Sequence, residues 1–347
     1  MQTSPKQHKR YLLPVLISAA TALTALVLCT GLGSVSISAA DSVNIIAHRL
    51  FGTELTPGIT DGMVAILCDI RIPRVITSFA CGAALSVSGV VMQAVLRNPL
   101  ASSYTLGVSS GASLGVVIIM VSGITIPLLG SLLMPVTGFI FGFATVIAAL
   151  VLSQILDNHG RSDTIVLIGM VLSLFLNAVV TFISQFFPDH RARIAIWLTG
   201  SFAGRNINHA IIMTVVTLVS LAVLMIFSRE LDIMTFGDEQ GLAMGVEVKR
   251  VRNIVLAITA LLTGVAVCLS GIIGFIDLIA PHVVRRVTGS SNKIVLPMAA
   301  CWGGIFMAIA DLISRTVLAP REIAVGAVTA IIGAPFFAYI YFARRKK

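Results

Sequence analysis

The longest uncharged stretch of this sequence lies between Arg97 and Asp157 and contains 59 residues. An α-helix rises about 1.5 Å per residue, so a single helix of this length would reach about 90 Å. The hydrocarbon core of a bilayer is only about 30 Å thick, and about 20 apolar residues cross it. We therefore expect the stretch to cross a membrane twice, with its turn at Ser122-Gly123 through Pro127. Such a chain is an integral membrane protein.

The composition agrees with this class. Hydrophobic residues make up 57% of the 347 residues and charged residues 11%, whereas a soluble domain carries about 25% charged residues. The net charge of +9 does not indicate a nucleic-acid partner, because the basic residues sit at the ends of apolar stretches, where membrane topology places them. The five cysteines show no CxxC or Cys/His spacing, so we expect no metal site.

The other apolar runs predict the remaining spans. The first, 11–33, exceeds the roughly 7–15 apolar residues of a signal peptide and is expected to stay as a helix. Single spans are also expected at 75–96, 164–188, 206–228, 253–276, 294–310 and 323–343. The ambiguous segment 275–287 is counted as one further span. The predicted fold is therefore all-α, with about ten transmembrane helices in a single membrane domain, residues 1–347.

Ten helices place both termini on the same side of the membrane. With the termini in the cytoplasm, 16 of the 24 Lys and Arg residues fall in cytoplasmic segments and eight fall outside. This bias follows the rule that loops rich in Lys and Arg stay inside. We therefore expect a multi-pass protein with both termini in the cytoplasm.

An internal repeat is visible when the sequence is compared with itself at an offset of 182 residues. The matching residues of the first half are Gly82, Ser88, Gly89, Pro99, Gly107 and Ser109, and those of the second are Gly264, Ser270, Gly271, Pro281, Gly289 and Ser291. The offset places the second span on the seventh, which is five spans later in the chain. Because five is an odd number, the matching spans cross the membrane in opposite directions, so the repeat is inverted. Inverted repeats, here roughly 63–190 and 245–343, are typical of transport proteins.

The motifs that are missing narrow the function. No GxxxxGK[ST] loop or HExxH is present, and we expect no enzyme and no catalytic residues. A stand-alone, ion-coupled secondary transporter is the alternative from a different class, and it needs intramembrane ionisable residues in both halves. The intramembrane acids, Asp277 and Asp311, both lie in the second half. A pump without its own energy source indicates a partner that supplies it.

Four segments carry specific motifs. They read RIPR at 71–74 with GAALSVSG at 82–89, MQAVLRNPLA at 92–101 with LGVSSGA at 106–112, GDEQGLAMGV at 237–246, and GIIGFIDLIAPH at 271–282. Together, these segments strongly resemble the FecCD-type permease subunits of bacterial ABC importers for iron–siderophore, haem and cobalamin. The likeness runs from about residue 10 to the end of the chain.

The resemblance implies the partners and the location. Such a permease pairs with a second permease subunit, here expected to be an identical chain, in the lipid of the bacterial cytoplasmic membrane. Two ABC ATPase subunits and one extracytoplasmic substrate-binding protein complete the importer. ATP is used by the ATPase subunits, so no cofactor is expected on this chain, and no nucleic acid takes part. The expected cargo is an iron–siderophore complex, with cobalamin and haem as alternatives within the family.

The resemblance also assigns site residues. Arg71 and Arg74, three apart and therefore on one face of a helix, would grip acidic residues of the binding protein, together with Arg315. An arginine can hold a carboxylate through two parallel hydrogen bonds, which suits such a contact. The loop 229–252 would form short coupling helices seated in the ATPase. The coupling residues expected from the motif are Gly237, Asp238, Glu239, Leu242 and Gly245.

Polar residues within apolar spans are the pathway candidates. They are Gln93, Asn177 and Asp277, each of which could face the pathway or bond to a neighbouring helix. Asp277 departs from the family pattern, which has Gly at that position. We expect Asp277 to line the pathway, to stay protonated, or to bond locally, for example with His282.

Overall fold

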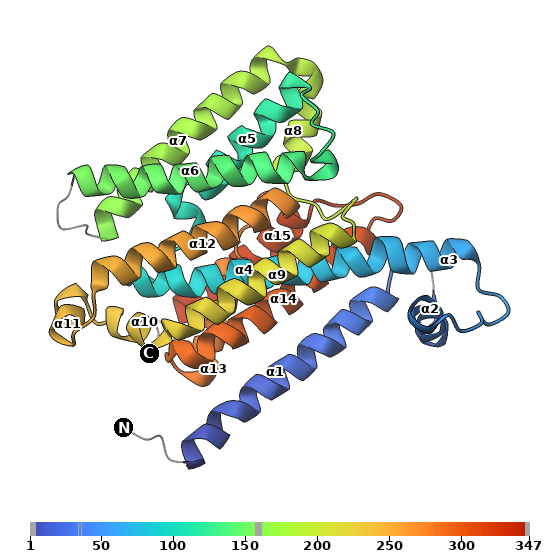
Figure 1. The fold of residues 1–347 in the computed structure, drawn as a ribbon, viewed down its shortest axis with the longest axis horizontal. Helices are drawn as coiled ribbons and strands as arrows, with labels where there is room; N and C mark the ends of the chain where they lie inside the picture. Colours follow the sequence, from blue (N-terminus) through green and yellow to red (C-terminus); the bar gives the residue numbers. More distant parts are fainter. Residues whose placement is uncertain (1–4, 34, 36, 157–161, 344–347) are drawn as a thin grey trace.

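The computed structural model describes residues 5–33, 35, 37–156 and 162–343. These residues form helices joined by turns, and no β-strand occurs among them (Figure 1). The long helices are α1 (Pro5–Gly31), α4 (Ile72–Val95), α5 (Val108–Ser122), α6 (Leu133–Leu156), α7 (Ser162–Phe186), α9 (Ile207–Ile226), α12 (Val248–Ser270), α13 (Ile276–Thr288), α14 (Asn292–Thr316) and α15 (Val325–Ala343). The shorter helices are α2 (Ala39–Phe51), α3 (Asp61–Ala65), α8 (Arg191–Leu198), α10 (Ser228–Met234) and α11 (Asp238–Ala243).

Ten of these helices correspond to the ten expected spans. Within the described part of the chain, 7 helices are long and apolar enough to cross a membrane, namely α1, α4, α6, α7, α9, α12 and α14. The shorter apolar helices α5 and α15 correspond to two further expected spans, and the 13-residue helix α13 corresponds to the ambiguous segment 275–287. The turn expected after Ser122 is present, since α5 ends there and Gly123 follows with a φ of 65°. The predicted all-α membrane fold is confirmed.

Helix α4 is the centre of the bundle. Nearly all of its side chains are buried, and it packs against α14, α12, α9 and α13. Small residues allow this close packing, as is usual between membrane helices. A Cβ on Gly82 would collide with the backbone oxygen of Gly303 on α14, and one on Gly89 would collide with the backbone oxygen of Asp277 on α13. These glycines set the distance between α4 and its two neighbours.

The helix contacts repeat between the two halves of the chain. Helix α4 packs on α14 as α12 packs on α6, and the pairs α5–α6 and α6–α7 have counterparts in α13–α14 and α14–α15. Helices α4 and α12 run in opposite directions side by side (Figure 1), as an inverted repeat requires. The offset of 182 residues fails beyond α4, because Pro99 lies in a turn whereas Pro281 lies inside α13. The connection 96–107 is longer than the connection 271–275.

The molecule has two distinct ends. At the left in Figure 1 lie α10 and α11, and here α1 begins and α15 ends; we call this the α11 end. At the right lie α2 and α3, and here α4 begins; we call this the α3 end. Neither α2 nor α3 was expected from the hydropathy of the sequence. A π-helical segment, η1 (Ile66–Arg71), joins α3 to α4, so that Asp61–Val95 forms one 35-residue apolar helix.

Candidate functional site

The loop 229–252 forms a compact charged unit at the α11 end. It contains α10 and α11, and α11 begins with Asp238 and Glu239, whose negative charge suits the first turn of a helix. Gly237 before α11 has a φ of 123° and Gly245 after it has a φ of 80°. Such positive values favour glycine, which has no Cβ. The short helix expected between these two glycines is therefore present.

Two acidic residues fix this unit to the bundle. Asp238 Oδ2 lies 2.6 Å from an NH2 nitrogen of Arg252, which is buried in the first turns of α12, and Arg97 lies 4.0 Å from Asp238 Oδ1. On α10, Asp232 accepts hydrogen bonds from the backbone N–H of Asn292 at 2.7 Å and from the Ser291 hydroxyl at 3.2 Å. Burial raises the pKa of Asp232, and the hydrogen bond from Asn292 opposes that shift. α10 is thereby tied to the start of α14.

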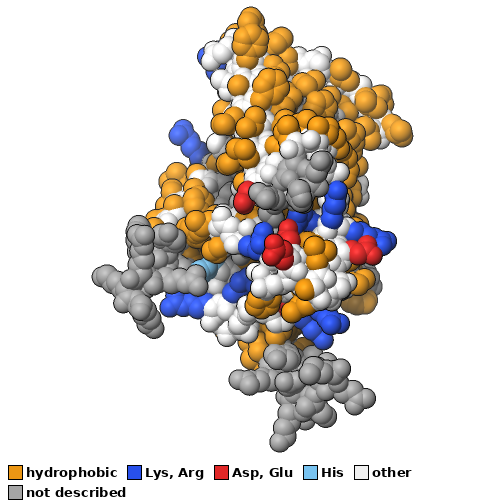
Figure 2. Space-filling view, turned by 90° about the vertical axis from the view of Figure 1, so that its left-hand side faces the viewer, with side chains coloured by type: hydrophobic (Ala, Val, Ile, Leu, Met, Phe, Trp, Pro, Cys, Tyr) orange, Lys and Arg blue, Asp and Glu red, His pale blue; other side chains and the backbone are white. Residues whose placement is uncertain are grey.

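The outward face of the unit mixes apolar and charged side chains. Phe236, Leu242 and Met244 are 68%, 63% and 63% exposed, and Glu239 is exposed beside them. A groove of about 570 Å³ lies next to this face, and it is lined by Leu242, Glu247, Val248, Lys249, Arg250, Asn253 and Ile254. Figure 2 faces this end and shows acidic and basic side chains gathered near its centre. Large exposed apolar side chains ringed by charges are typical of a protein-binding surface.

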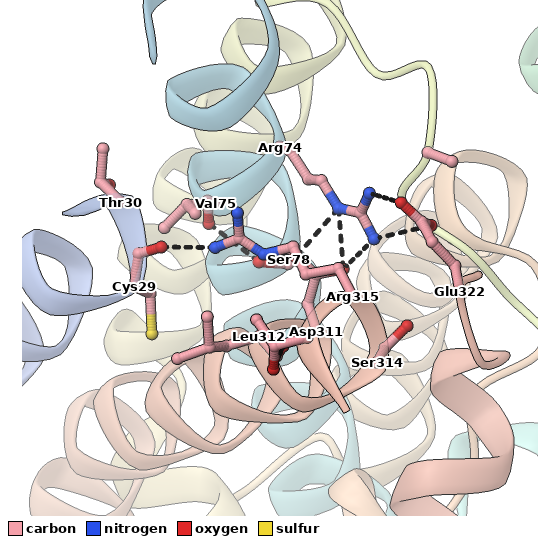
Figure 3. Close-up of polar contacts among 12 residues, drawn as sticks. Cys29, Thr30, Arg74, Val75, Ser78, Asp311, Leu312, Ser314, Arg315 and Glu322 are labelled. Atoms are coloured by element: carbon pink, nitrogen blue, oxygen red, sulfur yellow. Dashed lines mark hydrogen bonds and ion pairs between the residues drawn. The ribbon is translucent and has the colours of Figure 1, made fainter. Parts of the chain in front are cut away.

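Arg74, at the α3 end, is held by two carboxylates (Figure 3). Its Nε and NH2 nitrogens lie 3.0 and 2.8 Å from Asp311 Oδ1 on α14, and its NH1 nitrogen lies 2.6 Å from Glu322 Oε1. The side chain of Asp311 is 0% exposed, whereas that of Glu322, on the connection between α14 and α15, is 40% exposed. The planar guanidinium of Arg74 thus hydrogen-bonds to one carboxylate along each of two edges, the geometry in which arginine binds carboxylates most specifically. Arg74 thus joins the first half of the chain to the second.

Arg71 and Arg315 both bond to the backbone near the end of α1. Arg71 donates to the carbonyl oxygens of Gly31, at 3.0 Å, and Val35. Arg315 donates to the carbonyl of Cys29, and its Nε lies 3.7 Å from Asp311 Oδ2 (Figure 3). Arg71, Arg315 and Arg74 are the three residues that the family resemblance predicts to dock the binding protein.

The expectation that Arg71 and Arg74 share one exposed face is wrong, because they are only 4% and 5% exposed. The physical reason is local. The π-helical turn ends at Arg71 and directs it toward α1, whereas Arg74, in the α-helix that follows, reaches α14. Arg315 is buried as well. The docking role of the three arginines stays a prediction.

Two of the three pathway candidates lie together in the interior. Asp277 is 1% exposed, and its Oδ2 accepts hydrogen bonds from the backbone N–H of Ser103 at 2.9 Å, from the Ser103 hydroxyl at 3.1 Å and from Ser102. Gln93 lies 3.4 Å from the backbone oxygen of Asp277. Asn177 is elsewhere, exposed on α7.

The same region joins two connections between α-helices, 96–107, which contains a short 3-10 helix at Ser103–Leu106, and 271–275. The hydroxyl of Tyr104 donates to the carbonyl of Ile273 at 2.8 Å and links them. Interrupted helices where repeats meet are typical of transport sites. The geometry gives Asp277 a local hydrogen-bonded role, and its place on the pathway stays a prediction.

Sequence reasoning missed several residues at these sites. Glu322 and Arg252 look like ordinary loop and surface charges in the sequence, and Ser102 and Ser103 look like turn residues. The position of Arg252 could have been noticed in the sequence. It lies in the first turns of α12, as Arg74 lies in the first turn of α4. No cluster of three or more His, Cys, Asp or Glu side chains that could hold a metal occurs in the part of the chain that the structure describes.

Comparison with known proteins decides the family. The model of the FecCD transport family matches residues 21–343, which is nearly the whole chain. The chain belongs to the FecCD transport family. It is thus a permease subunit of an ABC importer and a multi-pass protein of the bacterial inner membrane.

Other FecCD permeases and a solved structure agree with this assignment. The uncharacterized ABC transporter permease protein YvrB of Bacillus subtilis (strain 168) is 37% identical over 89% of this chain and 87% of its own length. The Fe(3+)-citrate import system permease protein YfmE of the same organism is 32% identical over 100% of both chains, and the hemin transport system permease protein HmuU of Yersinia pestis is 32% identical over 90% and 93%. A solved structure of an ABC transporter in an inward-facing conformation has a TM-score of 0.83 and 26% identity over 96% and 100%.

Proposed function

We propose that this FecCD permease imports an iron–siderophore complex as one of two identical membrane subunits, driven by two ATPase subunits and supplied by one substrate-binding protein. Relatives whose names state a role in iron–citrate import support an iron-chelate cargo. Haem and cobalamin are the alternatives, supported by relatives of both kinds. ATP hydrolysis belongs to the partner subunits, and both termini lie in the cytoplasm together with the α11 end.

The charged unit 229–252 is the observation that carries this proposal. It exposes Leu242 and Glu239 on a face flanked by Gly237 and Gly245, while Asp238 and Asp232 tie the same unit to α12 and α14. A unit with one face free and the other bonded to two central helices can pass movement from a partner into the bundle. We assign the free face to the ATPase subunit.

We assign the α3 end to the binding protein. Arg74 already holds two carboxylates there, so a carboxylate of the binding protein must replace one of them. Glu322 is the one that can leave, since its side chain is 40% exposed and lies on a connecting segment, whereas Asp311 is enclosed in α14. Docking would then move the connection between α14 and α15.

Uptake and ATP hydrolysis measured together test the assignment of the charged unit. The complete transporter is reconstituted in liposomes with its binding protein, and the labelled iron–siderophore complex is supplied outside. Glu239→Lys should reduce uptake per ATP hydrolysed at least severalfold, because the reversed charge meets the ATPase. Asp163→Lys, an exposed acid in the first turn of α7 and outside the unit 229–252, is the matched control.

Normal coupled uptake by Glu239→Lys would contradict the assignment of this face. Uptake of haem or cobalamin in place of the iron complex would change the proposed cargo and leave the assignment of the ATPase face unchanged. Intact-complex mass spectrometry of the purified transporter counts the subunits. Two copies of this chain with two ATPase subunits are expected, and a second, different permease chain would contradict the identical pair.

A further inference from the structure

Helix α2 has no part in the proposed function, yet it is well formed. The Ser38 side chain caps its first turn by accepting from the backbone N–H of Asp41 at 3.0 Å, and Gly52 ends it in a left-handed conformation with a φ of 70°. Both ends therefore stop the helix by local chemistry. Such caps hold thirteen residues in one defined orientation outside the main bundle.

One side of α2 packs against the protein. Ile45 is fully buried in a cluster with Ile37 and Leu67, and Ile46 and Met63 pack around it. Leu67 belongs to η1, so α2 rests on the segment that leads into the central helix α4. This contact fixes which side of α2 faces outward.

The outward side of α2 is apolar. Val43, Leu50 and Phe51 are 69%, 70% and 80% exposed, and Ala39 and Ala40 are exposed with them. At about 100° per residue, these positions fall within roughly one third of the helix circumference. In water such an arc is costly, because each side chain would lose the free energy of burial. We define it as the α2 apolar arc.

Polar side chains border the α2 apolar arc. The Asn44 side-chain oxygen accepts from the backbone N–H of Thr56 at 3.1 Å on one side. Arg49 lies about 80° beyond the other edge of the arc, with its side chain 66% exposed and 4.0 Å from Asp69. A helix with an apolar face and, on its other sides, polar residues and an exposed basic residue has the pattern of helices that lie in a membrane–water interface.

The position of α2 fits such an interface. Figure 1 shows α2 end-on at the α3 end, whereas the spanning helices run across the page, so α2 lies across the direction of the spans. Exposed apolar residues also lead along the chain from α1 toward α2, because Val27 and Leu28 of α1 are followed by Leu32 and Val35, and all four side chains are exposed. Since α1 ends at Gly31 and α2 begins at Ala39, this crosswise helix lies close to the depth at which the spanning helix leaves the lipid.

We propose that α2 is seated in the lipid headgroup region of the membrane, with the α2 apolar arc inserted among the upper acyl chains. The occupant of the arc is the lipid surface itself. α2 thereby anchors η1 and the start of α4 at a fixed depth. This inference requires only that the chain spans a membrane, and it is independent of the cargo.

Photo-cross-linking to lipid tests the proposal on the intact transporter. Benzoylphenylalanine is incorporated at Val43 or Leu50, and the complex is placed in nanodiscs of phosphatidylethanolamine and phosphatidylglycerol. After illumination, mass spectrometry measures the fraction of this chain that carries a lipid adduct. Leu23, exposed on spanning helix α1, is the positive control, and Glu54, exposed just after α2, is the negative control. Gel filtration confirms that each labelled transporter is folded.

Lipid adducts at Val43 and Leu50 close to the level at Leu23, and severalfold above the level at Glu54, are the expected result. Adducts at the level of Glu54 would overturn the proposal. Adducts to a second copy of this chain or to the binding protein would overturn it too, since the α2 apolar arc would then bind protein. A labelled variant that fails to fold is replaced by Phe51→benzoylphenylalanine, a closely similar side chain at an 80% exposed position.

Discussion

Arg74 and Arg252 occupy similar places in the two halves of the chain but are held in different ways. Each lies in the first turns of a central helix, α4 or α12, and these helices run in opposite directions. Arg74 meets Asp311, which is enclosed in the long helix α14. Arg252 meets Asp238, which is 32% exposed on the six-residue helix α11.

The difference concerns which partner can move. Asp311 cannot leave Arg74 unless α14 is pulled away from α4, and the two helices are in contact along much of their length. Asp238 belongs to a short helix flanked by Gly237 and Gly245, whose positive φ values mark tight turns. The inverted repeat therefore carries a fixed ion pair at the α3 end and an adjustable one at the α11 end.

Breaking the fixed ion pair between Arg74 and Asp311 should have the largest effect on stability. Asp311→Asn leaves Arg74 and Arg315 buried with too little negative charge, so we expect about 3–5 kcal/mol less stability. Thermal unfolding of the detergent-solubilised transporter, followed by gel filtration, measures the loss. Asp69→Asn, which removes an exposed acid at the same end, is the control and should be neutral. Equal unfolding temperatures for both variants would contradict the fixed pair.

The glycines Gly82 and Gly264 test the repeat itself. A Cβ at Gly82 would meet the backbone of Gly303, which cannot move aside, so Gly82→Ala should cost about 1–3 kcal/mol. A Cβ at Gly264 would lie 3.2 Å from the ring of Phe139, a side chain that can shift. Gly264→Ala also gains up to about 1 kcal/mol of helix propensity, so it should be near neutral. Thermal unfolding of the detergent-solubilised transporter compares the two variants. Equal losses of stability would show that the two halves of the chain pack alike at these glycines.

Breaking the adjustable pair should change coupling more than stability. Asp238→Asn removes one partner of Arg252, and we expect about 1 kcal/mol of lost stability, because solvent reaches Asp238. Uptake per ATP hydrolysed should fall severalfold, since α11 loses a bond to α12. Glu247→Gln removes an exposed pair with Arg250 and serves as control. Unchanged coupling in Asp238→Asn would show that the pair does not transmit movement.

A similarly small effect on stability is expected at Glu322. Glu322→Gln leaves Arg74 bonded to Asp311, so the loss should stay within about 0.5–1.5 kcal/mol. Affinity for the binding protein should rise severalfold, because the carboxylate that occupies Arg74 is gone. Surface plasmon resonance on the reconstituted transporter measures it, with Glu54→Gln as a control of equal charge. Weaker binding in Glu322→Gln would contradict the proposal that a carboxylate of the binding protein replaces Glu322 on Arg74.

The sequence predicted the spans well and the side-chain partners poorly. The spans follow from uncharged runs such as 98–156, because the bilayer imposes length and hydropathy on every helix. The turn at Gly123 and the helix after Gly237 follow from local backbone chemistry. Asp311 and Glu322 lie 237 and 248 residues from Arg74, and nothing local indicates that they meet. Helix α2 was missed because its charges interrupt the hydropathy signal.

The cluster of Arg74, Arg315, Asp311 and Glu322 has an electrical consequence. Two positive and two negative side chains cancel, so the group can shift with α4 and α14 without carrying net charge through the membrane potential. A single unbalanced charge would cost or release about 2.3 kcal/mol for each 100 mV that it crosses. While Glu322 stays in place, these four side chains therefore add no voltage dependence of their own to the motion of α4 and α14. Departure of Glu322 would give the remaining three side chains one positive charge and make the same motion responsive to the potential.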